Sequence, residues 1–341
     1  MKKSFNINRS ICFASLLSAL VLLIPGCEKN THEPLSILCM DTVCSVNAFE
    51  YGTDELYKDI TDRLLDLENK FSLTKADSEI NRVNKNAGIM PLSVSSDFSK
   101  VMNVALKVSE LTDGALDISA GPLINLWGIN TDRAKVPSKE EIAEAIKKID
   151  YKKIMVEGNS IFLTEKGMSI NLGAVVKGYA TDEVVSILKK HKAKRAIIDL
   201  GGNIYAFGRK EDHIPWIVGI KNPQNPAGEP LLKMMLKDNS VVTSGNYERY
   251  FMENGKRYHH IIDTKTGFPA ESGYASVTIT CKKSIVADCL STAAFVMGEE
   301  KTKAVIPEME KEFDSLIACI FIDKENNYSQ FGKIKAEKYR K

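Results

Sequence analysis

The chain has 341 residues, with 46 basic and 44 acidic side chains and a hydrophobic fraction of 44%. Because the two signs of charge are mixed along the chain, the sequence lacks the concentration of basic residues that nucleic-acid binding requires. A chain of this length and hydrophobicity can bury a large core, as one large domain or as two closely packed lobes.

The first predicted element is an export signal over residues 1–26. Three basic residues precede an apolar run over residues 11–24, which is too short for a comfortable membrane span. A small residue directly before Cys27 is typical of bacterial lipoprotein signals, so we expect Cys27 to be lipidated and to begin the mature chain. The alternative is an ordinary signal or short anchor with an incidental cysteine. With Cys27 lipidated, residues 27–35 would form a tether, and residues 36–341 a domain held at the periplasmic side of a bacterial membrane.

Beyond the signal, hydrophobic periodicity predicts a mixture of helices and strands. Helices are expected over residues 55–73, 78–84, 98–111, 140–149, 173–190 and 286–297, with one more near the C-terminus. Strands are expected over residues 36–49, 154–170 (as two strands and a turn), 196–207 (interrupted at Gly201-Gly202), 216–220, 231–235, 241–243, 257–262 and 276–280. A last strand is expected after the C-terminal helix, and a loop over 112–127. This order has no regular βαβ alternation. The sequence therefore predicts one large α+β domain with mixed or antiparallel sheets flanked by helices.

Five cysteines follow Cys27. An odd number in an exported protein suggests disulfides plus a free thiol, but a core of this size needs no disulfide, so buried unpaired thiols are the favoured interpretation. Cys39 and Cys44 are an odd number of residues apart in a run with strand character. We therefore expect their side chains on opposite faces, without a bridge between them.

The segment over residues 241–298 contains the densest group of reactive polar residues. Asp288 and Thr292 are four residues apart on a predicted helix, so their oxygens lie on one helix face and form half of a plausible Mg²⁺ site. The structural alternative is that Asp288 offsets the helix macrodipole while Thr292 bonds to a carbonyl of its own helix. The concentration of polar groups between apolar strands favours a catalytic site.

Two histidines in the same segment, His259 and His260, end a predicted strand, so only one of them can face a cleft. A histidine there can remove the proton of a hydroxyl nucleophile, whereas the alternative is that both are ordinary polar strand residues. Ser244-Gly245-Asn246 lacks the surroundings of a nucleophilic serine and is interpreted as a turn that shapes the site.

Residues 171–179 open a predicted helix with small residues. Backbone amides at a helix N-terminus favour phosphate, and Lys177 adds a positive charge, although the spacing is not that of a P-loop. The alternative is a plain amphipathic helix with a solvated lysine. Gly201-Gly202 gives a turn that a ligand can approach closely, or a simple bulge. The loop over 113–117 either presents Asp117 to a ligand or only ends a helix.

Nine segments together resemble the ApbE family of FAD:protein FMN transferases. They occur in order as MDT at 40–42, DSEINRVN at 77–84, TDGALD at 112–117, GPLINLWG at 121–128, INLGAVVKGYATD at 170–182, IIDLGGN at 197–203, TSGNYERYF at 243–251, YHHIIDTKTGFP at 258–269 and ADCLSTAAFVMG at 287–298. Each segment alone is a weak signal, but their number, order and spacing make the resemblance specific.

The resemblance implies an exported, T-fold-related α+β enzyme that binds FAD and a divalent metal, usually Mg²⁺. Such an enzyme moves the FMN half of FAD to a threonine hydroxyl of an acceptor protein and releases AMP. Family acceptors include subunits of Rnf-type and sodium-pumping quinone reductase complexes. The implied metal ligands are Asp288, Thr292 and the carbonyl of Ala174, with His260 as the base. The implied FAD contacts are Met40, Ala115, Leu116, Asp117, Asn171, Lys177 and Ile261.

Two positions depart from the family pattern. Asn171 stands where the family often has an acid, and Thr74 stands where it often has an aromatic residue that covers the flavin ring. The loss of that stacking bears on how FAD is held and on whether water competes with the acceptor hydroxyl. Two other functions therefore stay open: hydrolysis of FAD to FMN and AMP, and flavin binding without chemistry by a lipoprotein.

Overall fold

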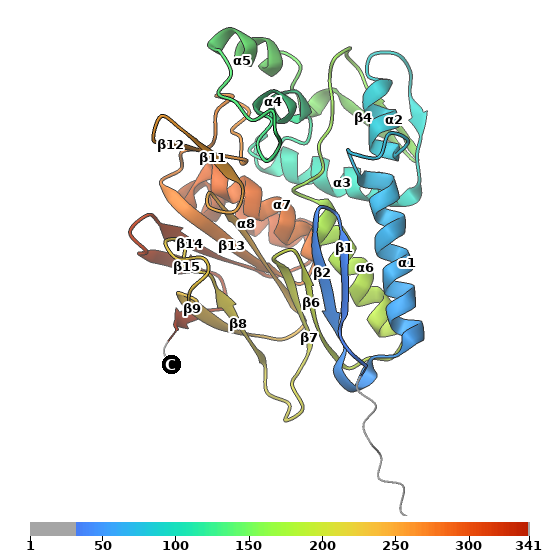
Figure 1. Cartoon of the computed structure of the whole chain (residues 1–341), viewed down its shortest axis with the longest axis vertical. Coiled ribbons are helices and arrows are strands. Elements are labelled where there is room, and N and C mark those ends of the chain that lie inside the picture. Colours follow the sequence, from blue (N-terminus) through green and yellow to red (C-terminus); the bar gives the residue numbers. More distant parts are fainter. Residues whose placement is uncertain (1–31, 340–341) are drawn as a thin grey trace, which may run out of the picture. The chain divides into compact units, whose positions relative to one another are not determined.

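The computed structural model describes residues 32–339, and its centre is an eight-stranded antiparallel sheet in the order β1-β2-β6-β7-β10-β13-β14-β15 (Figure 1). Residues 32–339 belong to one compact unit. The α+β class predicted from the sequence is confirmed. The strands of this sheet are β1 (Leu35–Cys39), β2 (Thr42–Asn47), β6 (Arg195–Leu200), β7 (Asn203–Gly208), β10 (Asn239–Gly245), β13 (Tyr274–Cys281), β14 (Ile317–Asp323) and β15 (Tyr328–Phe331).

Helices pack on one face of this sheet and share a single large core with it. Many of the helices begin at a serine or threonine whose side chain accepts an N–H of the first turn, as Ser78 does from Asn81. The main helices are α1 (Asp54–Phe71), α3 (Ser96–Leu111), α6 (Val176–Lys190), α7 (Ser284–Met297) and α8 (Glu299–Phe313). Three shorter helices are α2 (Glu79–Lys85), α4 (Gly121–Trp127) and α5 (Lys139–Ile146).

Three small sheets complete the domain. The first, in the order β16-β9-β8, covers part of the other face of the central sheet, where Trp216 and Met234 pack with Val241 and Ile320. Its strands are β8 (Trp216–Ile220), β9 (Leu232–Leu236) and β16 (Ala336–Lys338), and the second sheet consists of β3 (Leu92–Ser93), β5 (Ser160–Leu163) and β4 (Ile154–Glu157). The third is the hairpin of β11 (Tyr250–Glu253) and β12 (Lys256–His259), which packs through Phe251 and Tyr258 on Trp127.

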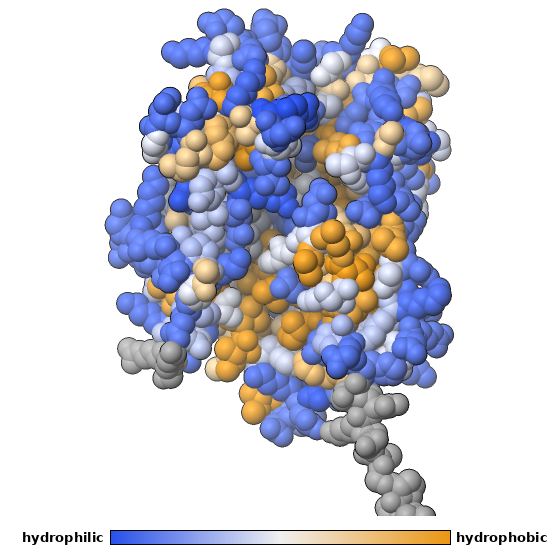
Figure 2. Space-filling view, in the orientation of Figure 1, coloured by the Kyte–Doolittle hydropathy of each residue, from blue (hydrophilic) through white to orange (hydrophobic). Residues whose placement is uncertain are grey.

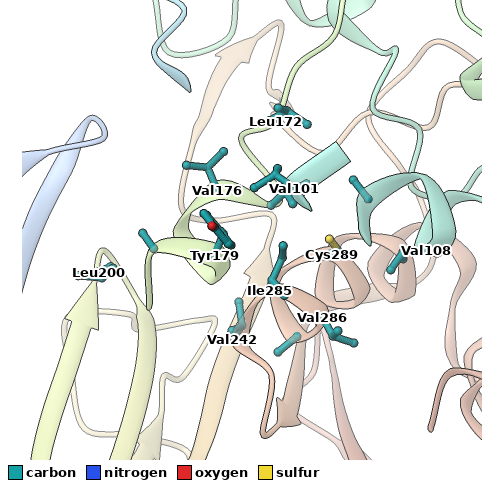
Figure 3. Packing of buried hydrophobic residues seen from close by; sticks show 14 of the residues in the cluster. Val101, Val108, Leu172, Val176, Tyr179, Leu200, Val242, Ile285, Val286 and Cys289 are labelled. Carbon is teal, nitrogen blue, oxygen red and sulfur yellow. The ribbon is translucent and has the colours of Figure 1, made fainter. Parts of the chain in front are cut away.

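Helices α3, α6 and α7 meet in the part of the core that supports the candidate site. Val101 from α3, Val176 and Tyr179 from α6, and Ile285 from α7 lie together there (Figure 3). Beside them the Tyr179 hydroxyl donates to Asp97 at 2.7 Å, and Asp97 also pairs with Arg63 of α1. Those interactions hold the pKa of Asp97 well below its usual range, mainly through the Arg63 hydrogen bonds. The start of α6 is therefore fixed by α1 and α3 before any ligand binds.

The predicted single strand over residues 36–49 is wrong, because the chain forms a hairpin there. Met40 and Asp41 make the two-residue turn between β1 and β2, both with positive φ, at 55° and 56°. The turn reverses the chain, so Cys39 and Cys44 point to the same core face rather than to opposite faces. Cys39, Cys44, Cys281, Cys289 and Cys319 are all buried and unpaired, as predicted.

Other differences are local. The predicted loop over residues 112–127 contains α4, whose Pro122 occupies a position in the first turn where no amide donor is needed. The predicted strand over 241–243 is the middle of the longer β10, so Ser244 and Gly245 belong to a strand rather than a turn. The sequence patterns also missed β11, whose residues are mostly exposed.

The edge of the central sheet is apolar at the β1–β2 hairpin. Leu38 is 79% exposed and its cross-strand partner Val43 is 59% exposed. Figure 2 shows an apolar patch over this hairpin. No helix within residues 32–339 is long and apolar enough to cross a membrane.

Candidate active site

The candidate site is built where the first turn of α6 meets the middle of α7. Gly178 donates its backbone N–H to Oδ2 of Asp288 at 2.8 Å. Gly178 is the third residue of α6, so its N–H belongs to the first turn and has no partner within the helix. Within the described residues, neither the Ala174 carbonyl nor Oδ1 of Asp288 accepts a hydrogen bond. A buried carboxylate and a backbone carbonyl are therefore left with unused oxygen lone pairs at one helix turn.

This close approach of α6 and α7 requires a glycine. A Cβ on Gly178 would lie 2.5 Å from the carbonyl oxygen of Ser284 and 2.8 Å from Cβ of Asp288. Sequence analysis did not identify Gly178 as a site residue. The available signal was a glycine inside a helical pattern, which often has a packing or functional reason.

Asp182 and Asp288 form a reciprocal pair of caps across the same contact. Asp288 of α7 accepts from α6, and Asp182 of α6 accepts from the first backbone N–H groups of α7, those of Ser284 at 2.8 Å and Ile285 at 3.0 Å. Burial raises the pKa of Asp182 to about 6, and burial also raises the pKa of Asp288. Each helix thus supplies the cap that the other helix lacks from its own sequence.

We expect Gly178→Ala to lower the free energy of unfolding by about 2–3 kcal/mol, because the added methyl group meets backbone atoms that cannot move aside. The measurement is urea unfolding followed by circular dichroism. Gly158→Ala is the control, since nothing lies within 4 Å of a Cβ there and only its left-handed φ of 57° opposes alanine, at about 1 kcal/mol. An equal loss in the two variants would contradict the steric account.

Thr292 lies one turn after Asp288 on α7 and faces β10. Its Oγ1 is 3.3 Å from Oγ of Ser244, and Oγ of Ser244 is 2.8 Å from Oγ of Ser291. The structural alternative for Thr292, a bond to a carbonyl of its own helix, does not occur in the described residues. Ser291, rather than Thr292, donates to the Asp288 carbonyl at 2.9 Å.

Lys177 supplies the positive charge of the site. Its Nζ donates to the carbonyl of Gly173 at 3.2 Å and pairs with no carboxylate of the described chain. Burial raises the pKa of Asp288, and the nearby ammonium partly offsets that rise. The same charge helps to lower the pKa of His260. Lys177, Asp288 and His260 therefore share one electrostatic environment, although they come from three different elements.

The two histidines have different environments. His259 is buried against the Phe295 ring; its Nε2 donates to the Ala270 carbonyl at 3.1 Å, and its Nδ1 accepts from the Ile261 amide at 3.3 Å. His260 is half-buried, and its Nδ1 lies 3.2 Å from the Arg249 carbonyl. A carbonyl can only accept, so Nδ1 carries the proton and Nε2 keeps a free lone pair. The structure thus agrees with one structural histidine and one that can act as a base.

We expect the contribution of His259 to the stability of the fold to fall as the pH drops from about 6.5 toward 4. Burial lowers the pKa of His259 to about 4 from the 6.5 of an unburied histidine, so the unfolded chain binds the proton first. His259 alone contributes a loss of about 3 kcal/mol over that range. Urea unfolding at pH 7 and pH 5 measures about 2 kcal/mol of this loss. His259→Gln should reduce the pH dependence and exposed His213→Asn should not; an unchanged slope in His259→Gln would contradict the assignment.

The other predicted ligand loops are tied to the same region by backbone bonds. The amide of Asn171 donates to the carbonyl of Ile118 at 2.9 Å, which joins the loop of Asp117 to the segment before α6. Asn84 of α2 exchanges two hydrogen bonds with the backbone of Ile170 and so holds that segment in place. Sequence analysis did not single out Asn84, whose signal was a polar side chain at the end of a helix.

Several predicted contact residues have limited freedom to reach a ligand. Leu116 and Ile261 have buried side chains, so only their backbone atoms are available. Asp117 is half-buried and accepts from the amide and hydroxyl of Ser119, and burial raises its pKa. Met40 and Ala115 are half-buried at the edge of the core. Cys27 lies outside the described residues.

Residues 32–339 contain no group of three or more His, Cys, Asp or Glu side chains that could hold a metal ion. The oxygen set at α6 and α7 is of a different kind, since it combines one carboxylate with a hydroxyl and a backbone carbonyl. Hard divalent cations such as Mg²⁺ accept such mixed oxygen donors and usually keep several waters. The donor chemistry therefore fits a cation of that class.

Comparison with known proteins gives a consistent result. The sequence model of the ApbE family matches residues 40–317. The FAD:protein FMN transferase of Treponema pallidum is 37% identical over 269 residues, which cover 74% of this chain and 73% of the relative. The protein of that name from Haemophilus influenzae is 33% identical over 325 residues, which cover 91% and 92%.

Solved structures agree with the sequence comparison. The crystal structure of the ApbE protein from Thermotoga maritima superimposes with a TM-score of 0.77 at 30% identity, covering 87% of this chain and 96% of the other. The flavin transferase ApbE from Vibrio cholerae gives a TM-score of 0.76 at 28% identity, covering 88% and 96%. The match thus extends over nearly all of the described fold.

Proposed function

The chain belongs to the ApbE family and is a flavin transferase, and from this premise we propose that it uses Mg²⁺ to move the FMN half of FAD to a threonine hydroxyl of an acceptor protein, with release of AMP. The observation that carries the proposal is the contact of Gly178 with Asp288, because it leaves oxygens for a cation beside the positive charge of Lys177.

The donor set suits the proposed ion. Asp288, Thr292 and the carbonyl of Ala174 would hold Mg²⁺ with oxygens that have lone pairs to spare. When bound, Mg²⁺ would neutralise charge on the pyrophosphate oxygens, which is the main requirement of phosphoryl transfer.

The chain's own groups would position FAD. The positive end of the α6 dipole and the ammonium of Lys177 favour a pyrophosphate there. The loop of Asp117 and the segment of Asn171 are fixed to each other by the Ile118 bond and would form the flavin side. Asn171 brings no charge to that side, and its Oδ1 already accepts from Gly173 at 2.9 Å.

His260 is the proposed general base. Its Nε2 would take the proton of the acceptor threonine while the threonine oxygen bonds to the FMN-side phosphorus. The bond from that phosphorus to the bridging oxygen breaks, and AMP leaves with that oxygen. Burial lowers the pKa of His260 to about 4, so the ring is neutral at neutral pH and its Nε2 lone pair is unprotonated.

One experiment tests the function against its rivals. The purified protein is incubated with FAD, Mg²⁺ and an acceptor fragment that carries the target threonine. A covalently fluorescent acceptor with one AMP per attached FMN is expected. Free FMN without labelled acceptor would indicate a hydrolase, and unchanged FAD would indicate a binding protein. An acceptor from an Rnf-type or sodium-pumping quinone reductase complex is the appropriate substrate.

We also propose that the protein is exported and attached to the membrane through lipidated Cys27. The sequence pattern before Cys27 supports this. In cells, Cys27→Ser is expected to abolish palmitate labelling and to release the protein from the membrane fraction. Cys12→Ser, within the predicted signal, is the control. A membrane-bound, labelled Cys27→Ser protein would contradict the proposal.

A further inference from the structure

Three hydroxyl groups between β10 and α7 form a hydrogen-bonded series that ends at a backbone carbonyl. Ser291 lies 2.9 Å from the backbone carbonyl of Asp288, Ser244 lies 2.8 Å from Ser291, and Thr292 lies 3.3 Å from Ser244. Ser291 is fully buried, while Ser244 and Thr292 are half-buried. Ser244 is therefore the residue that links the Thr292 hydroxyl to the Ser291 hydroxyl.

The direction of every bond in this series follows from counting protons. A carbonyl cannot donate, so the single hydroxyl proton of Ser291 goes to Asp288. The short contact between Ser291 and Ser244 then requires Ser244 to donate. With its own proton used, Ser244 can only accept from Thr292. The hydroxyl proton of Thr292 thus points at β10, and its lone pairs stay unshared within the described residues.

From this we infer that Ser244 is a positioning residue, which orients the Thr292 hydroxyl so that its lone pairs, rather than its proton, face a divalent cation. The inference rests on the proposed function, since it concerns the same cation. A hydroxyl whose proton faced the cation would repel it, and a freely rotating hydroxyl would spend part of its time in that orientation. Partners that orient a ligand in this way commonly account for a 10–100-fold difference in metal affinity.

The test measures binding of Mn²⁺, as a probe for the divalent site, to the purified full chain. Electron paramagnetic resonance of the free ion gives the affinity without any turnover. We expect Ser244→Ala to bind Mn²⁺ about 10–100-fold more weakly than the unchanged protein. Thr243→Val is the matched control, because Thr243 is the next residue of β10 and its hydroxyl pairs with Thr278 at 2.8 Å instead. We expect its Mn²⁺ affinity to be unchanged.

A double variant separates positioning from general damage. If Ser244 acts through Thr292, Ser244→Ala should weaken binding no further in a Thr292→Val background. Additive losses, or unchanged affinity in Ser244→Ala alone, would overturn the inference. Unchanged Mn²⁺ affinity in Asp288→Asn and Thr292→Val would instead overturn the metal assignment itself, so the two failures are distinguishable.

Discussion

Replacement of Asp288 by asparagine is expected to lower the rate of FMN transfer by about 10³-fold or more. A bound metal supplies several kcal/mol of charge stabilisation in the transition state, and each 1.36 kcal/mol is a factor of ten in rate. Asparagine keeps an oxygen that can accept the N–H of Gly178, so the contact of α6 with α7 survives. What is lost is the negative charge and one oxygen ligand. The measurement is covalent flavin on the acceptor, with AMP release in parallel.

Asp182→Asn is the matched control for this variant. Asp182 is also a carboxylate that caps a helix across the same contact, but its two oxygens accept from backbone N–H groups of α7. We expect that variant to change stability more than rate. If Asp288→Asn retained full activity at saturating Mg²⁺, or if the two variants lost activity equally, the metal assignment would be wrong.

Replacement of His260 by glutamine is expected to reduce FMN transfer by about 10²–10⁴-fold, the usual contribution of a general base. FAD binding should be unchanged, because no charge is removed from the site when the ring is neutral. Glutamine can still donate to the Arg249 carbonyl, which preserves the end of the β11–β12 hairpin. Single-turnover transfer with prebound FAD measures the chemical step, and fluorescence quenching of the flavin measures binding.

The adjacent His259→Gln provides the control for the base. Both ring nitrogens of His259 are engaged with backbone groups, so it has none to offer to a substrate. Its replacement should lower the stability of the fold and reduce the pH dependence of that stability. The rate of FMN transfer should stay within a few-fold of that of the unchanged protein. Equal loss of transfer in the two variants, with both folded, would show that the hairpin's geometry matters and that His260 is not the base.

The helices were predictable because their signals are local. The caps at Ser78 and Ser95 and the apolar spacing of α1 lie within a few residues of the structure they produce. The predicted strand across Met40 was wrong because the local signal of a turn is missing there. The two-residue turn has positive φ at Met40 and Asp41, but it contains no glycine or asparagine. Pattern alone favoured one continuous strand.

The site was only partly predictable. The spacing of Asp288 and Thr292 correctly placed both oxygens on one helix. No pattern in the sequence shows that Asp288 caps a glycine 110 residues earlier or that Ser244 reaches Ser291, because those pairings depend on how the helices dock. The start of α6 was placed at 173, three residues early, because the turn over 172–175 contains small residues that are also compatible with a helix.

The exchange of caps between α6 and α7 also sets an order of assembly. Its bonds join residues 102 to 110 positions apart, so the first turn of α6 cannot be completed until the chain through α7 is available. Contacts of such long sequence separation carry a loop-closure cost that slows folding. An N-terminal fragment that already contains Lys177 would thus lack a finished pyrophosphate site. If the protein is exported unfolded, as proposed above, FAD in the cytoplasm would meet only an unfinished enzyme.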